Sequence, residues 1–137
     1  MVAALSAVET VNQAMQSSVD AALLTRMNER GQITGCTVDG PLAMDNAVSA
    51  EAAAHKGIKS PVAGNADILL VPNVETGNAA YKILHYFSNA RFAGIIAGAS
   101  APIVLTSRSD SSESKQNSIA LAAFIAAQKR RSDKKSP

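Results

Sequence analysis

Short runs of Ala, Ile, Leu and Val, almost free of charged residues, alternate along this chain with longer segments typical of helices. Continuous apolar runs are typical of strands buried on both faces, and their alternation with helices is typical of a parallel sheet covered by helices on both sides. The sequence therefore predicts an α/β fold with a mostly parallel sheet. The predicted strands cover residues 2–8, 33–38, 66–72, 92–98 and 102–106.

The segments between these strands carry helix signals. The predicted helices cover about 17–30, 42–56, 78–90 and 111–128. Asp39-Gly40-Pro41 is expected to end the second strand, with Pro41 in the first turn of the next helix. Three-four spacing predicts which side chains face inward in the first and last helices. These are Val19, Ala22, Leu23 and Met27 in the first helix and Ile119, Ala122, Ala123 and Ala126 in the last, with Phe124 beside them.

The charge of the chain is concentrated at its end. Residues 129–137 hold five Lys or Arg and one Asp, whereas residues 1–128 hold eight basic and ten acidic side chains. We expect a folded body over 1–128 and a basic, mobile tail over 129–137. A nearly neutral body with 4% aromatic residues and no Trp argues against a nucleic-acid-binding surface.

The single cysteine, Cys36, excludes an intrachain disulfide and gives no sign of an oxidising compartment. We expect Cys36 to be a small buried residue of the strand 33–38. The first 25 residues lack Lys and Arg, as a signal peptide would not, and no apolar run reaches 18 residues. The sequence therefore predicts a cytoplasmic protein without a membrane partner.

Polar residues follow three predicted strands at the point where a helix begins, in 38–41, 71–78 and 105–111. The carboxyl ends of parallel strands share one edge of a sheet, and ligands bind there. Helix N-termini at that edge attract anions such as phosphate. These three junctions are the candidate binding positions.

The junction 105–111 offers the strongest chemistry, because Arg108 can hold a phosphate or carboxylate with two prongs and its neighbours carry hydroxyls. The hydroxyls belong to Thr106, Ser107, Ser109, Ser111 and Ser112. The structural alternative is a serine-rich turn in which Asp110 and Glu113 form a capping box.

The other candidates also have structural alternatives. Asp39 is either a base or a residue that favours the turn before Gly-Pro, and Asn73 and Glu75 either contact a ligand or cap the next helix. His55 and His85 are 30 residues apart and form no metal-ligand pattern, so we predict no metal site.

Four longer segments resemble the C-terminal half of the phosphate acetyl/butyryltransferase family, and their residues are more similar to those of the butyryltransferases than to those of the acetyltransferases. Together they extend over about residues 3–123. The segments are AVETVN (7–12), VDGPLAMDNAVS (38–49), AGNADILLVPNVETGNAAYK (63–82) and FAGIIAGASAPIVLTSRSDSSESKQNSIALA (92–122).

This resemblance implies a reaction in which acyl-CoA and phosphate give acyl phosphate and CoA. It also implies a fold similar to isocitrate and isopropylmalate dehydrogenase, usually as a homodimer. CoA is then a substrate and no cofactor is bound. Family chains are about twice as long, so the resemblance implies a missing N-terminal half of the same fold.

The resemblance also implies roles for individual residues. Ser107 and Arg108 match a catalytic Ser-Arg pair, and Asp110 and Glu113 are the candidates for the base that deprotonates the CoA thiol. The other residues expected to bind substrate are Thr106, Ser111, Asp39, Asn73, Glu75, Gly77 and Asn78.

Three other interpretations stay open. The first is a phosphate acetyltransferase, with the same chemistry and a shorter acyl group. The second keeps the fold as a metal-dependent dehydrogenase, which would depend on magnesium. The third is a truncated, non-catalytic α/β fragment that only dimerises and does not respond to CoA or phosphate.

Overall fold

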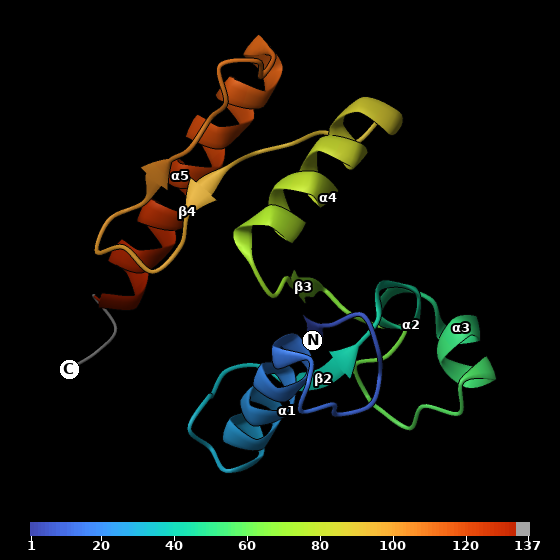
Figure 1. Cartoon of the computed structure of the whole chain (residues 1–137). Helices are drawn as coiled ribbons and strands as arrows, with labels where there is room; N and C mark the ends of the chain where they lie inside the picture. The colour runs from blue at the N-terminus through green and yellow to red at the C-terminus, as the bar shows by residue number, and fades with distance from the viewer. Residues whose placement is uncertain (134–137) are drawn as a thin grey trace. The chain divides into compact units, whose positions relative to one another are not determined.

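The computed structural model describes the backbone of residues 1–133 and the side chains of residues 1–129. The chain divides into two compact units, the first formed by Met1–Ala80 and the second beginning at Tyr81. Both combine strands with helices, as predicted (Figure 1). Each unit is described by itself below.

The first unit contains a three-stranded parallel sheet, which confirms the parallel arrangement predicted for this part of the chain. The strand order is β2-β1-β3. The elements are β1 (Val2–Leu5), α1 (Gln16–Glu29), β2 (Val38–Leu42), α2 (Met44–Val48), α3 (Ala50–His55) and β3 (Ile68–Leu70).

Both faces of this sheet are covered, because neighbouring side chains of β1 enter different clusters. Ala3 and Leu5 pack with buried residues of α2 and α3. Ala4 packs instead with Ala21 of α1 and with Val38. Since side chains alternate between the two faces of a strand, α1 covers one face and α2 with α3 the other.

The strand β2 continues through the segment that was expected to end it. Gly40 and Pro41 lie inside β2, joined by a cis peptide bond, and the pairing reaches Leu5 opposite Leu42 after an irregularity in register. A Cβ atom on Gly40 would lie 2.5 Å from the backbone oxygen of Ala4. Glycine therefore allows the strands to approach, and a proline is tolerated at such an irregularity.

The predicted strand 33–38 is wrong, because β2 begins only at Val38 and Cys36 is exposed. Residues of this connection form hydrogen bonds with the side chain of Asn28 where a strand would pair with its neighbour. Its amide donates to the backbone oxygens of Ile33 and Cys36, at 2.9 and 3.0 Å, and its oxygen accepts from Val38 N–H at 2.9 Å. The expected burial of Cys36 is therefore wrong too.

The helix α1 lies where it was predicted, but its inward face differs. Ser18 and Ala21 are buried, whereas Leu23 is 57% and Met27 38% exposed. The small Ala21 side chain lets the helix approach the sheet, so large apolar residues are not required there. The single helix expected over 42–56 is divided into α2 and α3.

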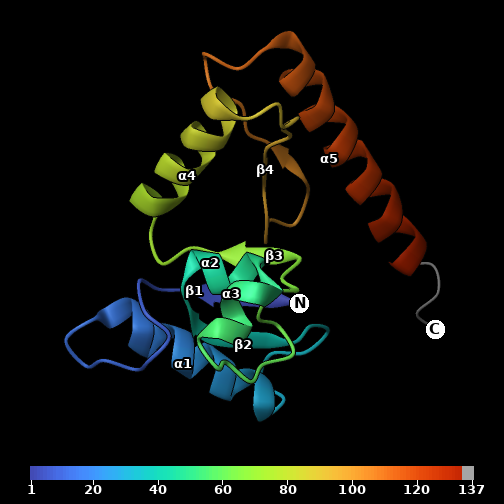
Figure 2. The same ribbon diagram turned by 90° about the vertical axis from the view of Figure 1, so that its right-hand side faces the viewer.

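The helix α4 (Val74–Phe87) begins before the boundary at Tyr81 and ends after it. Two short strands follow, β4 (Ile95–Ile96) and β5 (Ile103–Val104), which pair antiparallel. The expectation that the sheet is mostly parallel is therefore wrong for these two strands, because a short connection returns the chain directly. Both views show this hairpin beside α5 (Figures 1 and 2).

The helix α5 (Ser112–Asp133) continues beyond its predicted end near residue 128, and residues 134–137 of the predicted tail lie outside the described residues. Ala122 is buried, as predicted, but Ile119 and Phe124 are each 61% exposed. The inward side of α5 is formed partly by serines: Ser118 Oγ accepts from the Gly94 N–H of the hairpin at 2.9 Å. Polar contacts thus replace part of the expected apolar face.

Candidate functional site

The turn of residues 106–111 connects β5 to α5. Ser111 caps α5, since its Oγ accepts the Ser114 N–H at 3.1 Å. This is the side-chain cap typical of a helix N-terminus. The predicted capping box of Asp110 and Glu113 is therefore wrong, because Ser111 occupies the cap position and the Asp110 carboxylate has other partners.

Two hydrogen bonds join Asp110 to the backbone of Ser107 at the other end of the turn. Its Oδ2 accepts the Ser107 N–H at 2.6 Å, and its own backbone N–H donates to the backbone oxygen of Ser107 at 3.1 Å. Its Oδ1 accepts the Tyr81 hydroxyl at 2.8 Å. The Ser107 N–H and then the Tyr81 hydroxyl hold the pKa of Asp110 below its usual value, with smaller contributions from Lys82 and His85. Asp110 is therefore an ionised anchor of the turn.

The side chains of Arg108 and Glu113, by contrast, are exposed and form no hydrogen bond or ion pair within the described part of the chain. Within those residues Arg108 therefore forms no ion pair with Asp110 or with Glu113. The hydroxyls of Ser107 and Ser109, the residues on either side of Arg108 in the sequence, lie 3.1 Å apart. The turn brings together an unpaired cation and several hydroxyls, a combination suited to phosphate.

Two residues of α4 that the sequence analysis did not single out contact this turn. Tyr81 does so through Asp110, and Lys82 Nζ lies 3.5 Å from Ser109 Oγ and 5.0 Å from the centre of the Tyr81 ring. Their only sequence signal is their place at the end of the segment 63–82, directly after the predicted binding residues. Lys82 thus adds a second positive charge to the turn that carries Arg108.

Four of the predicted substrate-binding residues lie at or directly before the start of α4. Asn73 Oδ1 accepts the Thr76 N–H at 2.8 Å, which confirms the helix-cap alternative for Asn73. Glu75 and Asn78 are exposed in the first turns. Gly77 lies against Val71, where a Cβ atom would be 3.1 Å from a methyl carbon.

Asp39 is not at the carboxyl end of its strand. It lies within β2 opposite Ala3, and its Oδ1 accepts the Gly40 N–H at 2.9 Å. The turn expected at Asp39 is therefore wrong. The junctions 38–41 and 71–78 are thus less alike than their sequences indicate, because residues 38–41 lie inside a strand, whereas residues 71–78 lead from β3 into α4.

A charged cluster that the sequence analysis missed follows β1 and β2. Lys56 Nζ contacts Glu9 Oε1 and lies 3.0 Å from Asp45 Oδ2, and buried Asn46 donates to Glu9 Oε1 at 3.1 Å. The Lys56 ammonium lowers the pKa of both carboxyls, and Glu9, then Asp45, raises the pKa of Lys56. This cluster is an ion-pair network in which one ammonium lies between two carboxylates.

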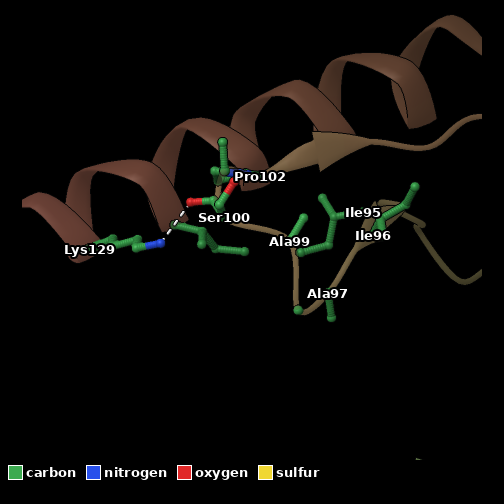
Figure 3. A pocket seen from close by; sticks show the side chains of 10 residues that line it. Ile95, Ile96, Ala97, Ala99, Ser100, Pro102 and Lys129 are labelled. Atoms are coloured by element: carbon green, nitrogen blue, oxygen red, sulfur yellow. Dashed lines mark hydrogen bonds between the residues drawn. The ribbon is translucent and has the colours of Figure 1, made fainter.

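A hollow of about 200 Å³ lies in the second unit between the β4–β5 connection and α5 (Figure 3). It is lined mainly by residues 95–102 with Ile125 and Lys129, and Lys129 Nζ donates to the Ser100 oxygen at 2.7 Å. None of the predicted site residues lines this hollow. It lies toward the end of α5, whereas the turn 106–111 lies at the start of that helix.

Neither histidine joins a metal-ligand cluster: among the described residues, no three His, Cys, Asp or Glu side chains gather as a metal ion would require. His85 packs in an aromatic group with Tyr81, Tyr86 and Phe92, at ring distances of 4.9–5.9 Å. No helix within residues 1–133 is both long and apolar enough to cross a bilayer.

Comparison with known proteins extends these observations to a family. The chain is 61% identical over 126 residues to the phosphate butyryltransferase of Clostridium beijerinckii, covering 92% of this chain and 42% of that protein. It is 54% identical over 125 residues to the phosphate acetyltransferase of Thermotoga maritima, covering 91% and 42%. The chain thus spans about two fifths of the length of these relatives.

A solved structure agrees with the sequence comparisons. The branched-chain phosphotransacylase from Enterococcus faecalis V583 superposes with a TM-score of 0.78 at 47% identity, covering 89% of this chain and 44% of that one. Residues 1–123 match the family described as phosphate acetyl/butaryl transferase. The matched range includes the Ser107-Arg108 turn. The chain belongs to the phosphate acetyl/butaryl transferase family.

Proposed function

We propose that the protein to which this chain belongs transfers an acyl group between CoA and inorganic phosphate. The observation that carries the proposal is the Arg108 guanidinium, which has no partner within the described residues and belongs to a turn rich in hydroxyls before α5. Its chemistry fits the substrates named in the descriptions of the family and its relatives. The alternative of a metal-dependent dehydrogenase would need a cluster of side chains that bind an ion, and the described residues contain no such cluster.

In this proposal a phosphate oxygen attacks the thioester carbonyl carbon of acyl-CoA and forms a tetrahedral oxyanion. The carbonyl π electrons move to oxygen, and their return expels the CoA thiolate and leaves the acyl phosphate. Arg108 stabilises the oxyanion and the phosphate, and the Ser107 hydroxyl donates to the phosphate. A fixed donor at such a position contributes about 10²–10³ in rate.

Of the two carboxylates considered for proton transfer, we assign the role to Glu113. Asp110 is held ionised by donors on both oxygens, so a proton gained there would break the turn. Glu113 is exposed, has no partner within the described residues and lies in the first turn of α5. It is free to take the proton that the attacking hydrogen phosphate loses and to pass it to the departing thiolate, and to remove the thiol proton in the reverse direction.

Butyryl is the proposed acyl group, supported by 61% identity to the Clostridium beijerinckii butyryltransferase against 54% to the Thermotoga maritima acetyltransferase. The proposal keeps the homodimer and the cytoplasmic location expected from the sequence. Thr106, Ser111, Asn73, Glu75, Gly77, Asn78 and Asp39 stay predicted substrate-binding residues.

A hybrid protein tests the proposed activity. In it, this chain replaces the 126 matched residues of the Clostridium beijerinckii phosphate butyryltransferase. We expect the hybrid to release CoA from butyryl-CoA only when phosphate is present, and faster than from acetyl-CoA. The measurement is thiol release followed by a colour reagent.

The matched control is the same hybrid carrying Ser107→Ala, which removes the proposed hydroxyl together with its hydrogen bonds to Ser109. A hybrid that folds, as shown by its circular dichroism, but releases no CoA would contradict the proposal. Equal turnover of acetyl-CoA and butyryl-CoA would contradict only the acyl preference.

A further inference from the structure

The helix α4 supplies the second half of the support for the catalytic turn. The Tyr81 hydroxyl donates to one carboxylate oxygen of Asp110 at 2.8 Å, while the other carboxylate oxygen accepts the Ser107 N–H at 2.6 Å. A single carboxylate thus links a helix side chain to the backbone of the Ser107-Arg108 pair. Hydrogen bonds to an ionised group are stronger than neutral ones, so this link restrains the turn effectively.

The Tyr81 ring is itself held in place. Phe92 meets it edge-on with 5.1 Å between ring centres, His85 stacks on it at 5.9 Å, and Lys82 Nζ lies 5.0 Å from its centre. Burial, and then the Asp110 carboxylate, raise the pKa of the Tyr81 phenol. The hydroxyl therefore keeps its proton and acts as a fixed donor.

Arg108 depends on this backbone restraint, because its guanidinium has no partner of its own within the described residues. An unpaired long side chain is directed only by the backbone that carries it. A change of a few tenths of an ångström at Ser107 therefore moves the whole guanidinium relative to the substrate. Misplacement of a catalytic group by as little as 1 Å is costly in rate.

We propose that Tyr81 is a positioning residue, which fixes the Ser107-Arg108 turn through the Asp110 carboxylate. The inference rests on the proposed acyl transfer and assigns to α4 a part in it. Tyr81 contacts neither substrate nor reacting atoms in this proposal. Its loss changes how well Arg108 is aligned, and leaves the groups that bind substrate chemically unchanged.

A double-mutant cycle in the hybrid protein tests the link. Tyr81→Phe keeps the ring and removes only the hydroxyl, and we expect kcat to fall about tenfold with the KM for phosphate changed less than twofold. Asp110→Asn should lower kcat by at least as much. The double variant should be no worse than Asp110→Asn alone, because both changes break the same chain of contacts.

Tyr86→Phe is the matched control, because Tyr86 lies on the same helix, is 66% exposed and, within the described residues, has its ring contact with His85 and not with the turn. Its kcat should equal that of the unmodified hybrid. Strict additivity of Tyr81→Phe and Asp110→Asn, or an unchanged kcat in Tyr81→Phe, would overturn the proposal. A purely structural role would instead lower the urea midpoint and leave kcat per folded molecule intact.

A second measurement needs no activity. In the 137-residue chain, NMR titration should show a higher pKa for Asp110 in Tyr81→Phe than in the parent, and faster exchange of the Ser107 amide. Lys82 and His85 also face Asp110 and are the same in both proteins. If neither quantity changes, the positioning role is wrong even when the hybrid is active. If both change in a chain whose hybrid is inactive, the acyl-transfer proposal fails while the Tyr81 link stands.

Discussion

The two units differ in what holds them together. Of the eleven buried apolar residues in the described chain, ten belong to the first unit and only Ala122 to the second. The second unit leaves large apolar side chains such as Phe87 and Phe124 exposed, at 87% and 61%. Its turn is fixed instead by hydrogen bonds of Asp110 and Ser111, and a hydrogen bond to Ser118 holds the hairpin against α5.

This difference separates stability from chemistry. The first unit is stabilised mainly by apolar burial around β1 and β2, which contributes about 25 cal/mol for each Å² removed from water. The second unit presents an exposed cation on a turn whose polar contacts determine its shape. Substitutions in the first unit should therefore change the free energy of unfolding, and substitutions in the turn should change turnover.

The largest expected effect is on stability, from Leu42→Ala in the first unit. Leu42 is 2% exposed and belongs to the cluster with Ala3, Leu5 and Val62. Removing its side-chain carbons leaves a cavity, so the free energy of unfolding should fall by about 2–5 kcal/mol. Urea unfolding of the 137-residue chain, followed by circular dichroism, measures this loss.

The matched control is Ile103→Ala in the second unit, where Ile103 lies in β5 and is 46% exposed. Its loss should stay below about 1 kcal/mol, as for a partly exposed position. Equal losses for the two variants would contradict the claim that the units differ in their source of stability.

The next effect is on turnover, from Arg108→Lys in the hybrid protein. Lysine keeps the charge but loses the planar, two-pronged donor, so kcat should fall on the order of 10²-fold. The free energy of unfolding should change by less than about 1 kcal/mol, because Arg108 has no partner within the described residues. Steady-state kinetics and urea unfolding on the same preparation give both values.

Arg91→Lys is the control for this substitution, since Arg91 is also exposed in the second unit and also has no described partner. It should change neither kcat nor stability. Near-normal turnover of Arg108→Lys would contradict the catalytic assignment and leave the family membership untouched.

The sequence predicted those parts of the fold that local pattern determines. The helices α1 and α4, the parallel pairing of β1 with β3 and the strand–turn–helix at 105–111 follow from apolar runs, caps and glycines. The likeness to the dehydrogenase folds stays a prediction. The turn stays the predicted site, and its chemistry can be recognised from the sequence because the guanidinium and the hydroxyls belong to adjacent residues.

The remaining features depend on contacts between distant residues, which no local pattern displays. Asn28 binds the connection that contains Cys36, and Gly40 lets β2 approach β1, so the strand begins and ends later than its composition indicates. Asp110 resembles a capping residue in sequence, yet its partner Tyr81 lies 29 residues earlier. A signal of that kind needs the folded chain.

The smallest expected effect comes from Lys56→Met in the charged cluster of the first unit. The Lys56 ammonium lowers the pKa of Glu9 and Asp45, so the network stabilises the fold above the ordinary carboxyl pKa and loses this contribution as pH falls through the lowered values. In Lys56→Met, NMR titration should show both pKa values shifted upward. Because exposed ion pairs contribute little, the melting temperature at neutral pH should change far less than in Leu42→Ala.

Lys59→Met, at an exposed lysine without a described partner, is the control and should leave the pKa values of both carboxyls as they are. A loss of stability in Lys56→Met as large as that in Leu42→Ala would show that charge, and not only apolar packing, holds the first unit together.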